Sequence, residues 1–292
     1  MVFYKYMTAS TAKLVLRGRC LRWSSPILFN DPFDVPRELA LGISASEIQK
    51  AVGDHFAYLL QNPPENLDEL SPRVAFIVDT AKRASPEQMK QLVQGALEVA
   101  SQQAQNKDSS SLEEIRRMWR SWISDFRILC LCRSPEKTSM WYHYSDKYSG
   151  IVLELACNDE RDSPWLLAQP VQYPNNTPEL LTAAGWGRLM TLKTEVTIEK
   201  LLHAYTFNKT PDWRYEEEWR TTTFKRPQDT GNFTDWAVPP QDFSKVFLGP
   251  HISEEDRLEI LNLLTGDLSH VVPLQARIEL DRHFTFVPLT LR

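Results

Sequence analysis

The sequence predicts an α+β protein in which a mostly antiparallel sheet forms the core and a helical insertion follows the second strand. Three observations lead to this expectation. Short apolar and aromatic runs typical of strands occupy residues 2–6 and 21–24, residues 36–127 carry helical patterns, and strand patterns return from Ile128 onward. The chain has 292 residues, and single hydrophobic cores grow to about 250–300 residues. We therefore expect a single domain over residues 1–292, with residues 36–127 inserted within it.

Residues 1–35 predict a strand, a short helix and a second strand. The first run, residues 2–6 (VFYKY), is apolar and aromatic, and residues 8–16 have room for one or two helical turns before Gly18. Residues 21–24 (LRWS) alternate as a strand does. The Asn-Asp-Pro sequence at 30–32 then predicts a turn, because Asn and Asp side chains bond their own backbone.

The insertion is predicted from helix starts and helical spacing. Residues 44–60 keep apolar side chains on one helical face. Residues 85–88 (SPEQ) match a capping box with proline at the first helical position, and residues 111–114 (SLEE) give another start. We expect this segment to shape access to a site or to recognise a partner.

Beyond Arg127 the pattern is again that of strands, with helices between them. We expect strands at residues 128–132, 151–155, 219–224, 246–249 and 278–287. Helical turns are expected over residues 140–148, ended by Gly150, and a final helix opens at residues 253–256 and is stopped by Gly266.

Composition excludes several classes of protein. The formal net charge of −5 and the 42% hydrophobic content exclude a disordered chain and a basic nucleic-acid arm as descriptions of the whole. No apolar run is long enough for a membrane helix, and the first residues lack a secretory signal pattern, so we expect no membrane association and a cytoplasmic location. The four cysteines fit neither a disulfide framework nor a zinc site, and Cys130 and Cys132 are expected to be buried thiols.

Four clusters of polar and aromatic residues lie where predicted strands meet turns. The first two come from the N-terminal strands and the turn after them. They comprise Tyr4, Lys5, Tyr6, Arg22, Ser24, Asn30 and Asp31. Tyr4, Lys5 and Tyr6 fit either a ligand site or an amphipathic edge strand. The turn either only fixes the chain or holds a polar ligand beside Arg22 and Ser24.

The third cluster is the segment 140–148 (MWYHYSDKY). Three aromatic residues and a histidine at positions 141–144 cannot all face one core, so some of them line a surface or a cleft. His143 fits a general base that Asp146 orients. No GxSxG nucleophile elbow accompanies them, and a hydrolase triad is therefore unsupported.

The fourth cluster is the segment 213–220 (WRYEEEWR). At strand spacing, Glu216, Glu218 and Arg220 share one face, and carboxylates crowded on one face raise a carboxyl pKa. The alternative is a solvated edge strand in which Arg220 is the counter-ion. Phosphate-loop, dinucleotide-fingerprint and HExxH motifs are missing from the sequence, so kinase-like, Rossmann and zincin chemistry are poor candidates, and no metal is expected.

Taken in order, YKY at 4–6, FNDPFD at 29–34, MWYHYSDKYSG at 140–150 and WRYEEEWR at 213–220 resemble a large bacterial family of unknown function, DUF2971. Members of that family usually carry a YKY or YHY start, an NDP(F)E turn, a WxHY segment with a downstream glycine and an ExExR strand. This sequence has Asp34 where glutamate is commoner, and Lys5 where some members have histidine.

The family is remotely similar to the ADP-ribosyltransferase fold, in which an N-terminal strand, a central aromatic and a late glutamate-bearing strand surround NAD. The resemblance implies NAD as substrate and cofactor. Lys5 or Tyr6 would match the ribose contact of the first strand, Tyr144 or Trp141 the central aromatic, and Glu218 with Glu216 the catalytic acidic strand.

This chemistry is physically reasonable for the residues present. Cleavage of the nicotinamide glycosidic bond develops oxocarbenium character, which a carboxylate such as that of Glu218 stabilises. An aromatic face attracts the cationic nicotinamide ring, and Arg22 suits a bidentate contact with the pyrophosphate.

The expected function is therefore cleavage of NAD, or transfer of ADP-ribose to a protein or nucleic-acid acceptor, in a toxin or phage-defence effector. Arg116, Arg117 and Arg120 of the insertion are candidates for holding that acceptor. One alternative is another nucleotide-processing or nuclease activity in the same cleft, and a second is a non-catalytic nucleotide-binding or interaction module. Clusters represented by Tyr6, Arg22, Tyr144 and Glu218 are expected to meet at one pocket.

Overall fold

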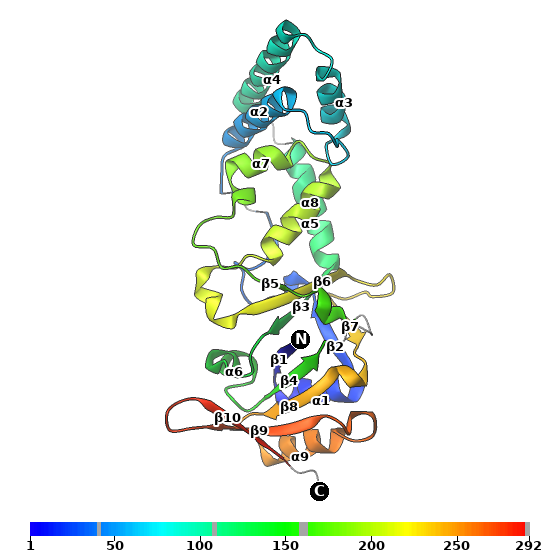
Figure 1. The fold of residues 1–292 in the computed structure, drawn as a ribbon, viewed down its shortest axis with the longest axis vertical. Helices are drawn as coiled ribbons and strands as arrows, with labels where there is room; N and C mark the ends of the chain where they lie inside the picture. Colours follow the sequence, from blue (N-terminus) through cyan, green and yellow to red (C-terminus); the bar gives the residue numbers. More distant parts are fainter. Residues whose placement is uncertain (40–41, 107–109, 158–162, 290–292) are drawn as a thin grey trace. The chain divides into compact units, whose positions relative to one another are not determined.

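The computed structural model describes residues 1–39, 42–106, 110–157 and 163–289 (Figure 1). The chain divides into two compact units. Unit 1 consists of Met1–Phe29, Asp125–Tyr173 and Thr210–Arg292, and unit 2 of Asn30–Ser124 and Pro174–Lys209. Unit 1 contains the sheet, and unit 2 is helical.

Unit 1 is built on a mostly antiparallel sheet, and this confirms the predicted class of fold. Its strands are β1 (Val2–Met7), β2 (Cys20–Ser24), β3 (Phe126–Cys132), β4 (Ile151–Ala156), β5 (Gln169–Pro170), β6 (Glu218–Phe224), β7 (Phe233–Ala237), β8 (Phe243–Leu248), β9 (Val272–Ile278) and β10 (Phe284–Pro288). Their order is β10-β9-β8-β4-β1-β3-β2-β7, and β6 pairs with β3 and β5. Among the described strand pairs, β8 and β9 alone run parallel, because helix α9 (Glu254–Leu263) connects them.

Strand β3 is the branch point of the sheet. Along one edge it pairs with β6 from Phe126 to Cys132. Its other edge is shared, because β1 pairs with it at Cys132 and β2 pairs with it at Ile128. The ammonium group of Lys5 donates to the carbonyl oxygen of Cys130, between those two points, at 2.8 Å. Lys5 thus satisfies a strand carbonyl that a continuous ladder would otherwise use.

Two buried clusters cover the two faces of the sheet in unit 1. On one face, helices α1 (Ala9–Gly18) and α9 pack over apolar strand residues such as Phe3 and Leu153. An ion pair of 2.7 Å between Lys13 and Asp256 joins these two helices. On the other face, Trp141 of the short helix α6 (Thr138–Tyr144) packs with strand residues such as Val152. The shorter 3-10 segments of this unit are η1 (Pro26–Leu28), η3 (Pro164–Leu167), η5 (Pro211–Glu216), η6 (Pro240–Asp242) and η7 (Gly266–Leu268).

The C-terminal strand pattern was not one strand. The expectation of a single strand over 278–287 is wrong, because β9 ends at Ile278 and β10 begins at Phe284. The five residues between them, four of them polar, reverse the chain: Arg282 has a φ of 67°, and the amide of Glu279 donates to the carbonyl of His283 at 3.0 Å. Strand β7 and helix α3 (Pro72–Ala81) are further elements that the sequence pattern did not predict.

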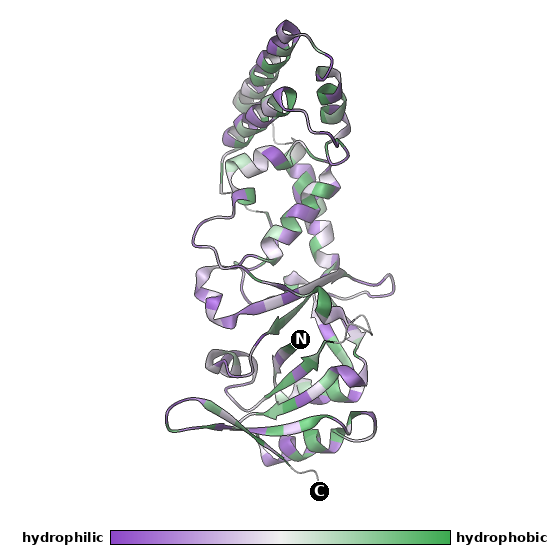
Figure 2. Ribbon diagram, in the orientation of Figure 1, coloured by the Kyte–Doolittle hydropathy of each residue, from purple (hydrophilic) through white to green (hydrophobic). Residues whose placement is uncertain are grey.

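Unit 2 is made of helices. They are α2 (Ala45–Gln61), α3, α4 (Pro86–Asn106), α5 (Ser110–Asp125), α7 (Ala183–Leu189), α8 (Thr194–Thr206) and the 3-10 turn η4 (Glu179–Leu181). Of these, α2, α4 and α5 begin at the predicted starts near residues 44, 85 and 111. The capping box predicted at Ser85 is present, since the Ser85 amide donates to Gln88 at 2.8 Å and the Gln88 amide donates back at 3.3 Å. Figure 2 shows the hydrophilic and hydrophobic bands that alternate along α2 and α4. None of the described helices is both long and apolar enough to cross a bilayer.

The stretch expected as an insertion ends slightly earlier than residue 127. Strand β3 begins at Phe126, so the last two residues of that stretch belong to the sheet. Residues 174–209, which carry η4, α7 and α8, belong to unit 2 together with α2 to α4. The helical unit is therefore assembled from two separate parts of the sequence.

Candidate functional site

The register of the sheet brings several predicted site residues to one face of unit 1. Tyr4 lies opposite Cys132 on β3, and Cys132 lies opposite Glu218 on β6. Two residues along the same pair of strands, Cys130 lies opposite Arg220. Residues directly opposite one another point to the same side of a sheet, as do residues two apart on one strand. These five side chains consequently share the face that α6 covers.

Glu218 and Arg220 form a buried ion pair on this face. The guanidinium of Arg220 donates to both carboxylate oxygens of Glu218, from Nε at 2.9 Å and from Nη2 at 2.8 Å. The side chain of Glu218 is 5% exposed and that of Arg220 is 1% exposed. The ring of Phe29 lies 5.5 Å from the guanidinium carbon of Arg220. The bidentate contact neutralises the Glu218 carboxylate inside the fold.

Glu216 is held by a different partner, because it is not on the strand. It ends the 3-10 segment η5, and Glu217 then turns the chain with a φ of 46°, so β6 begins only at Glu218. The expectation that Glu216, Glu218 and Arg220 share one strand face is therefore wrong for Glu216. Its buried carboxylate accepts a hydrogen bond from the hydroxyl of Tyr144 at 2.7 Å. Burial and the negative charge of Glu216 raise the pKa of Tyr144 well above its ordinary value.

The thiols of Cys130 and Cys132 lie beside this acidic pair. Both are free, Cys132 is buried, and Cys130 is half-buried. Burial raises the pKa of each thiol, the negative charge of Glu218 raises it further, and the ammonium of Lys5 opposes these effects. The thiols are consequently protonated and unreactive at neutral pH.

Tyr6 and Trp141 fix α6 and its preceding loop to the sheet, whereas Tyr4 joins β1 to β4. The hydroxyl of Tyr4 donates to Glu154 on β4 at 3.0 Å. The hydroxyl of Tyr6 donates to the carbonyl of Ser134 at 2.9 Å and accepts from the amide of Lys137. Trp141 packs edge-on against Tyr6 with ring centroids 5.7 Å apart and is fully buried at 0% exposure. Tyr6 and Trp141 are thus core residues that support a site and do not form its surface.

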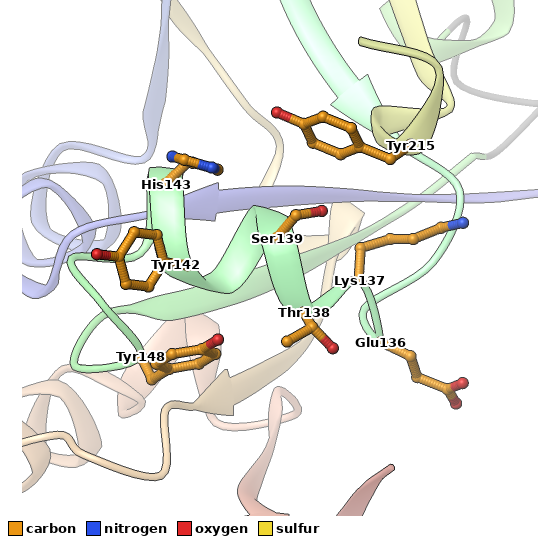
Figure 3. A pocket seen from close by; sticks show the side chains of 8 residues that line it. All are labelled: Glu136, Lys137, Thr138, Ser139, Tyr142, His143, Tyr148 and Tyr215. Carbon is orange, nitrogen blue, oxygen red and sulfur yellow. The ribbon is translucent and has the colours of Figure 1, made fainter. Parts of the chain in front are cut away.

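A pocket of about 680 Å³ opens beside α6. Its lining residues are Glu136, Lys137, Thr138, Ser139, Tyr142, His143, Tyr148 and Tyr215. Figure 3 shows that Tyr215 of η5 reaches toward His143, whose ring centroid lies 6.5 Å from its own, and that Ser139 projects between α6 and η5. Tyr142 and Tyr148 contact each other with centroids 6.0 Å apart. Aromatic rings and small hydroxyl side chains therefore dominate the walls.

Tyr148 reaches this pocket from a left-handed turn. Asp146, Lys147 and Tyr148 have φ values of 45°, 50° and 74°, a run of three residues in a region that costs about 1–2 kcal/mol per non-glycine residue. The amide of Lys147 donates to the carbonyl of Tyr142 at 3.1 Å, which closes the turn on α6. Gly150 ends it, because a Cβ there would lie 2.2 Å from the carbonyl oxygen of Met7. Within the described residues, no hydrogen bond joins Asp146 to His143.

These two segments, α6 with its turn and η5 with β6, are also where a comparison with known families gives a result. Residues 140–221 match the family model Protein of unknown function (DUF2971). The match confirms the resemblance to that family that the sequence motifs indicate. No curated protein and no solved structure matches the chain. The DUF2971 segment, residues 140–221, contains Tyr142, His143, Tyr148 and Tyr215 of the pocket.

Outside the DUF2971 segment, the predicted ligand contacts have other partners. Arg22 on β2 pairs with Asp235 on β7, at 2.9 Å and 3.0 Å, and its guanidinium carbon lies 3.7 Å from the ring centroid of Phe233. Ser24, two residues further along β2, pairs with Phe233 across the ladder. Arg22 therefore belongs to an ion pair at the β2–β7 edge of the sheet.

The predicted turn after β2 is present and lies in unit 2. Asn30 is exposed there, and a side-chain oxygen of Asp31 accepts from the amide of Phe33 at 2.9 Å, as expected for this turn chemistry. Asp34 pairs with Lys209 at 3.7 Å, and both side chains are 5% exposed. The turn therefore has a structural role within unit 2.

The pocket differs from the site that the sequence indicates. Tyr6, Arg22, Tyr144 and Glu218 were expected at one pocket, and none of them lines this one, although Tyr144 follows His143 on α6. Sequence reasoning missed the wall residues 136–139 and the buried Glu154, whereas Tyr215 belongs to the fourth predicted cluster. Glu154 had a usable signal, because it is the one charge in the apolar strand IVLELA. It accepts from Tyr4, from Ser244 at 2.8 Å and from Lys245 at 3.0 Å.

Proposed function

We propose that unit 1 is an NAD-cleaving enzyme, similar in chemistry to ADP-ribosyltransferases, which works in the pocket beside α6. The observation that carries the proposal is that two separate sequence motifs both contribute residues to the walls of this pocket. The aromatic motif around His143 and the acidic motif that contains Tyr215 border one cavity of about 680 Å³. Pockets for nucleotide-sized ligands commonly measure about 300–1,000 Å³.

The walls suit the nicotinamide end of NAD. Tyr142, Tyr148 and Tyr215 offer aromatic faces, and a ring face attracts a cation such as the oxidised nicotinamide by about 0.5–2 kcal/mol. Lys137 provides a positive charge for the pyrophosphate. It is paired with Glu217, whose side chain is 57% exposed, and such an exposed pair contributes at most about 1 kcal/mol. A phosphate can therefore replace Glu217 as the partner of Lys137.

The proposed reaction uses the groups nearest the pocket. Water attacks C1′ of the nicotinamide ribose while the bond from C1′ to nicotinamide breaks. Nicotinamide leaves with the bond electrons, which cancel its positive charge, and His143 accepts the proton that the water loses. The buried carboxylate of Glu216, the last residue of η5, accepts a hydrogen bond from Tyr144 and stabilises the oxocarbenium character by its charge. A nucleophile on a macromolecule in place of water would give ADP-ribose transfer, and loss of cellular NAD would suit a toxin or phage-defence effector.

Nicotinamide release from NAD by the purified full chain tests this proposal. We expect His143→Ala and Tyr215→Ala each to reduce the rate by at least about tenfold, since a general base contributes about 10²–10⁴-fold. His283→Ala is the matched control, because His283 is a histidine in the exposed β9–β10 turn of the same unit, with a side chain 56% exposed. Absence of both NAD cleavage and NAD binding would overturn the proposal. Cleavage that both pocket variants leave unchanged would exclude this pocket.

A second candidate function is nucleotide binding without catalysis. It is favoured by the Glu218–Arg220 pair, because the glutamate of the acidic strand is buried and already neutralised by two hydrogen bonds. Isothermal titration with NAD distinguishes the two functions. Binding that the Tyr215→Ala substitution weakens, with no nicotinamide released over hours, would favour the binding module over the enzyme.

A further inference from the structure

Unit 2 contains a second pocket, of about 500 Å³, that plays no part in the function proposed above. Its walls come from α2, from the loop between α2 and α3, and from η4, α7 and α8. The loop is held in place by backbone hydrogen bonds, since the amide of Lys193 donates to the carbonyl of Glu69 at 2.9 Å and the amide of Ser71 to that of Thr191 at 3.0 Å. Backbone hydrogen bonds within the helical unit therefore fix the loop that forms part of the pocket wall.

The floor of this pocket is apolar. Leu59, Leu70 and Leu189 all line it, and their exposed fractions are 6%, 6% and 0%. Leu180 and Leu192 add further aliphatic surface. Removal of apolar ligand surface from water gains about 25 cal/mol per Å², so such walls select a ligand with an apolar body.

The rim of the pocket carries an excess of positive charge. Arg188 and Lys200 both line it, and Glu69 is the one carboxylate among the lining residues. His55 adds no charge at neutral pH, because burial and the neighbouring Arg188 lower its pKa. The lining residues therefore carry a formal net charge of about +1, since lysine and arginine are protonated at neutral pH, and Glu179 outside the lining offsets it through its ion pair with Arg188.

Both cations are available to a ligand anion. Arg188 pairs with Glu179 at 2.8 Å, and Lys200 pairs with Glu69 at 3.2 Å. The two carboxylate side chains are 80% and 63% exposed. Exposed pairs of this kind contribute about 0–1 kcal/mol, so exchange of a glutamate for a ligand anion costs little. A ligand anion that also buries an apolar body on the leucine floor would gain more binding free energy than the exposed ion pair with glutamate contributes.

We propose that this pocket of unit 2 binds a small amphipathic anion, with its apolar body on the leucine floor and its single acidic group between Arg188 and Lys200. A carboxylate or a sulfonate on an aliphatic or aromatic body has this chemistry. The site is independent of NAD cleavage and lies wholly within the helical unit.

Fluorescence titration of the full chain with 8-anilinonaphthalene-1-sulfonate tests the proposal, because this probe has an apolar body and one anionic group and becomes fluorescent in apolar surroundings. We expect saturable binding at one site. Arg188→Gln and Lys200→Gln should each weaken binding at least about threefold, and together at least about tenfold, since loss of one screened charge contact costs about 1 kcal/mol. N-phenyl-1-naphthylamine, the same body without the sulfonate, should bind at least about tenfold more weakly.

Two further variants make the result specific. Leu180→Trp should abolish binding, because it enlarges a half-buried side chain on the pocket wall without opening the core. Lys90→Gln is the matched control for charge, since Lys90 is exposed on α4 and does not line the pocket. Equal binding of the neutral and the anionic probe, binding indifferent to Arg188→Gln and Lys200→Gln, or no saturable binding would each overturn the proposal.

Discussion

The guanidinium of Arg220 donates hydrogen bonds of 2.9 Å and 2.8 Å to the two carboxylate oxygens of Glu218, which lies two residues earlier on the same strand. Residues two apart on a strand point to the same side, which makes this contact possible without any other element. With 1% and 5% of the side chains exposed, each charge depends on protein partners in place of water.

We predict that Glu218→Gln lowers the free energy of unfolding by about 3 kcal/mol, because it removes a negative charge that pairs with the buried guanidinium of Arg220. The double variant Glu218→Gln with Arg220→Gln should lose less than the sum of the two single variants. Urea denaturation followed by circular dichroism measures these values, and Glu255→Gln on the exposed side of α9 is the control. A Glu218→Gln variant within about 0.5 kcal/mol of the native chain would contradict the prediction, since surface changes fall in that range.

The raised pKa of Tyr4 predicts that the folded protein loses stability at alkaline pH. Burial, together with the negative charge of Glu154, raises the pKa of Tyr4 from 10.0 to about 12. The folded chain therefore holds this proton more tightly than the unfolded chain. The resulting stability is fully present below pH 10 and is lost as the pH rises from 10 through about 12.

Replacement of Tyr4 by phenylalanine should make the unfolding free energy fall less steeply between pH 10 and about 12. Some slope will remain, because burial also raises the pKa values of Tyr6 and Tyr144. Urea titrations at several pH values across that range measure the slope. Tyr58→Phe, at a side chain 58% exposed in unit 2, should leave it unchanged. Parallel curves for Tyr4→Phe and the native chain would count against the assigned pKa.

The sequence predicts the class of the sheet and the helix starts near residues 44, 85 and 111, and the structure confirms both. The predicted Ser85 capping box depends only on residues three apart, and it is present. Helix α2 has a capping box at Ser44 as well, where the sequence pattern predicted only the helix. The turn chemistry of Asp31 is likewise local. Such interactions are readable because the partners are fixed by sequence spacing alone.

The site was harder to predict because its geometry depends on backbone reversals and long-range partners. Strand spacing put Glu216 beside Glu218, but the φ of 46° at Glu217 ends that periodicity, and no residue pattern reveals it. A hydrogen-bond partner of Glu216 is Tyr144, 72 positions away. Trp141 was expected to face a ligand, yet it is fully buried. Sequence indicates which segments carry chemistry, and tertiary packing decides which of their side chains remain accessible.

The left-handed turn before Gly150 predicts an unusual effect of glycine. Lys147 has a φ of 50° and an exposed side chain, so its Cβ raises the energy of the folded backbone. Glycine removes that strain of about 1–2 kcal/mol and costs about 0.5–1 kcal/mol in chain entropy. Lys147→Gly should therefore stabilise unit 1 by about 0.5–1 kcal/mol in urea denaturation, whereas Lys147→Ala, which keeps the Cβ, should match the native chain. Identical stabilities for the two variants would show that the turn is unstrained at this position.

Two glycines in the helices of unit 2 should respond to alanine with opposite signs. Gly95 lies in α4, and a Cβ there would meet nothing within 4 Å. Gly53 lies in α2, and a Cβ there would come 2.4 Å from the Cβ of Ala100 on α4. Alanine is the better helix former by about 0.8–1.0 kcal/mol, but forced overpacking costs about 1–3 kcal/mol. The second effect is the larger one wherever the two helices touch.

Gly95→Ala should therefore raise the thermal midpoint of unit 2, and Gly53→Ala should lower it. The double variant Gly53→Ala with Ala100→Gly moves the methyl group from α4 to α2 and removes the clash, so it should recover most of the loss, less the cost of a glycine within α4. Circular dichroism at the helical minimum follows all four chains. A Gly53→Ala variant as stable as Gly95→Ala would mean that α2 and α4 do not approach each other at this position in solution. Failure of the double variant to recover stability would instead assign the loss to strain within α2 itself.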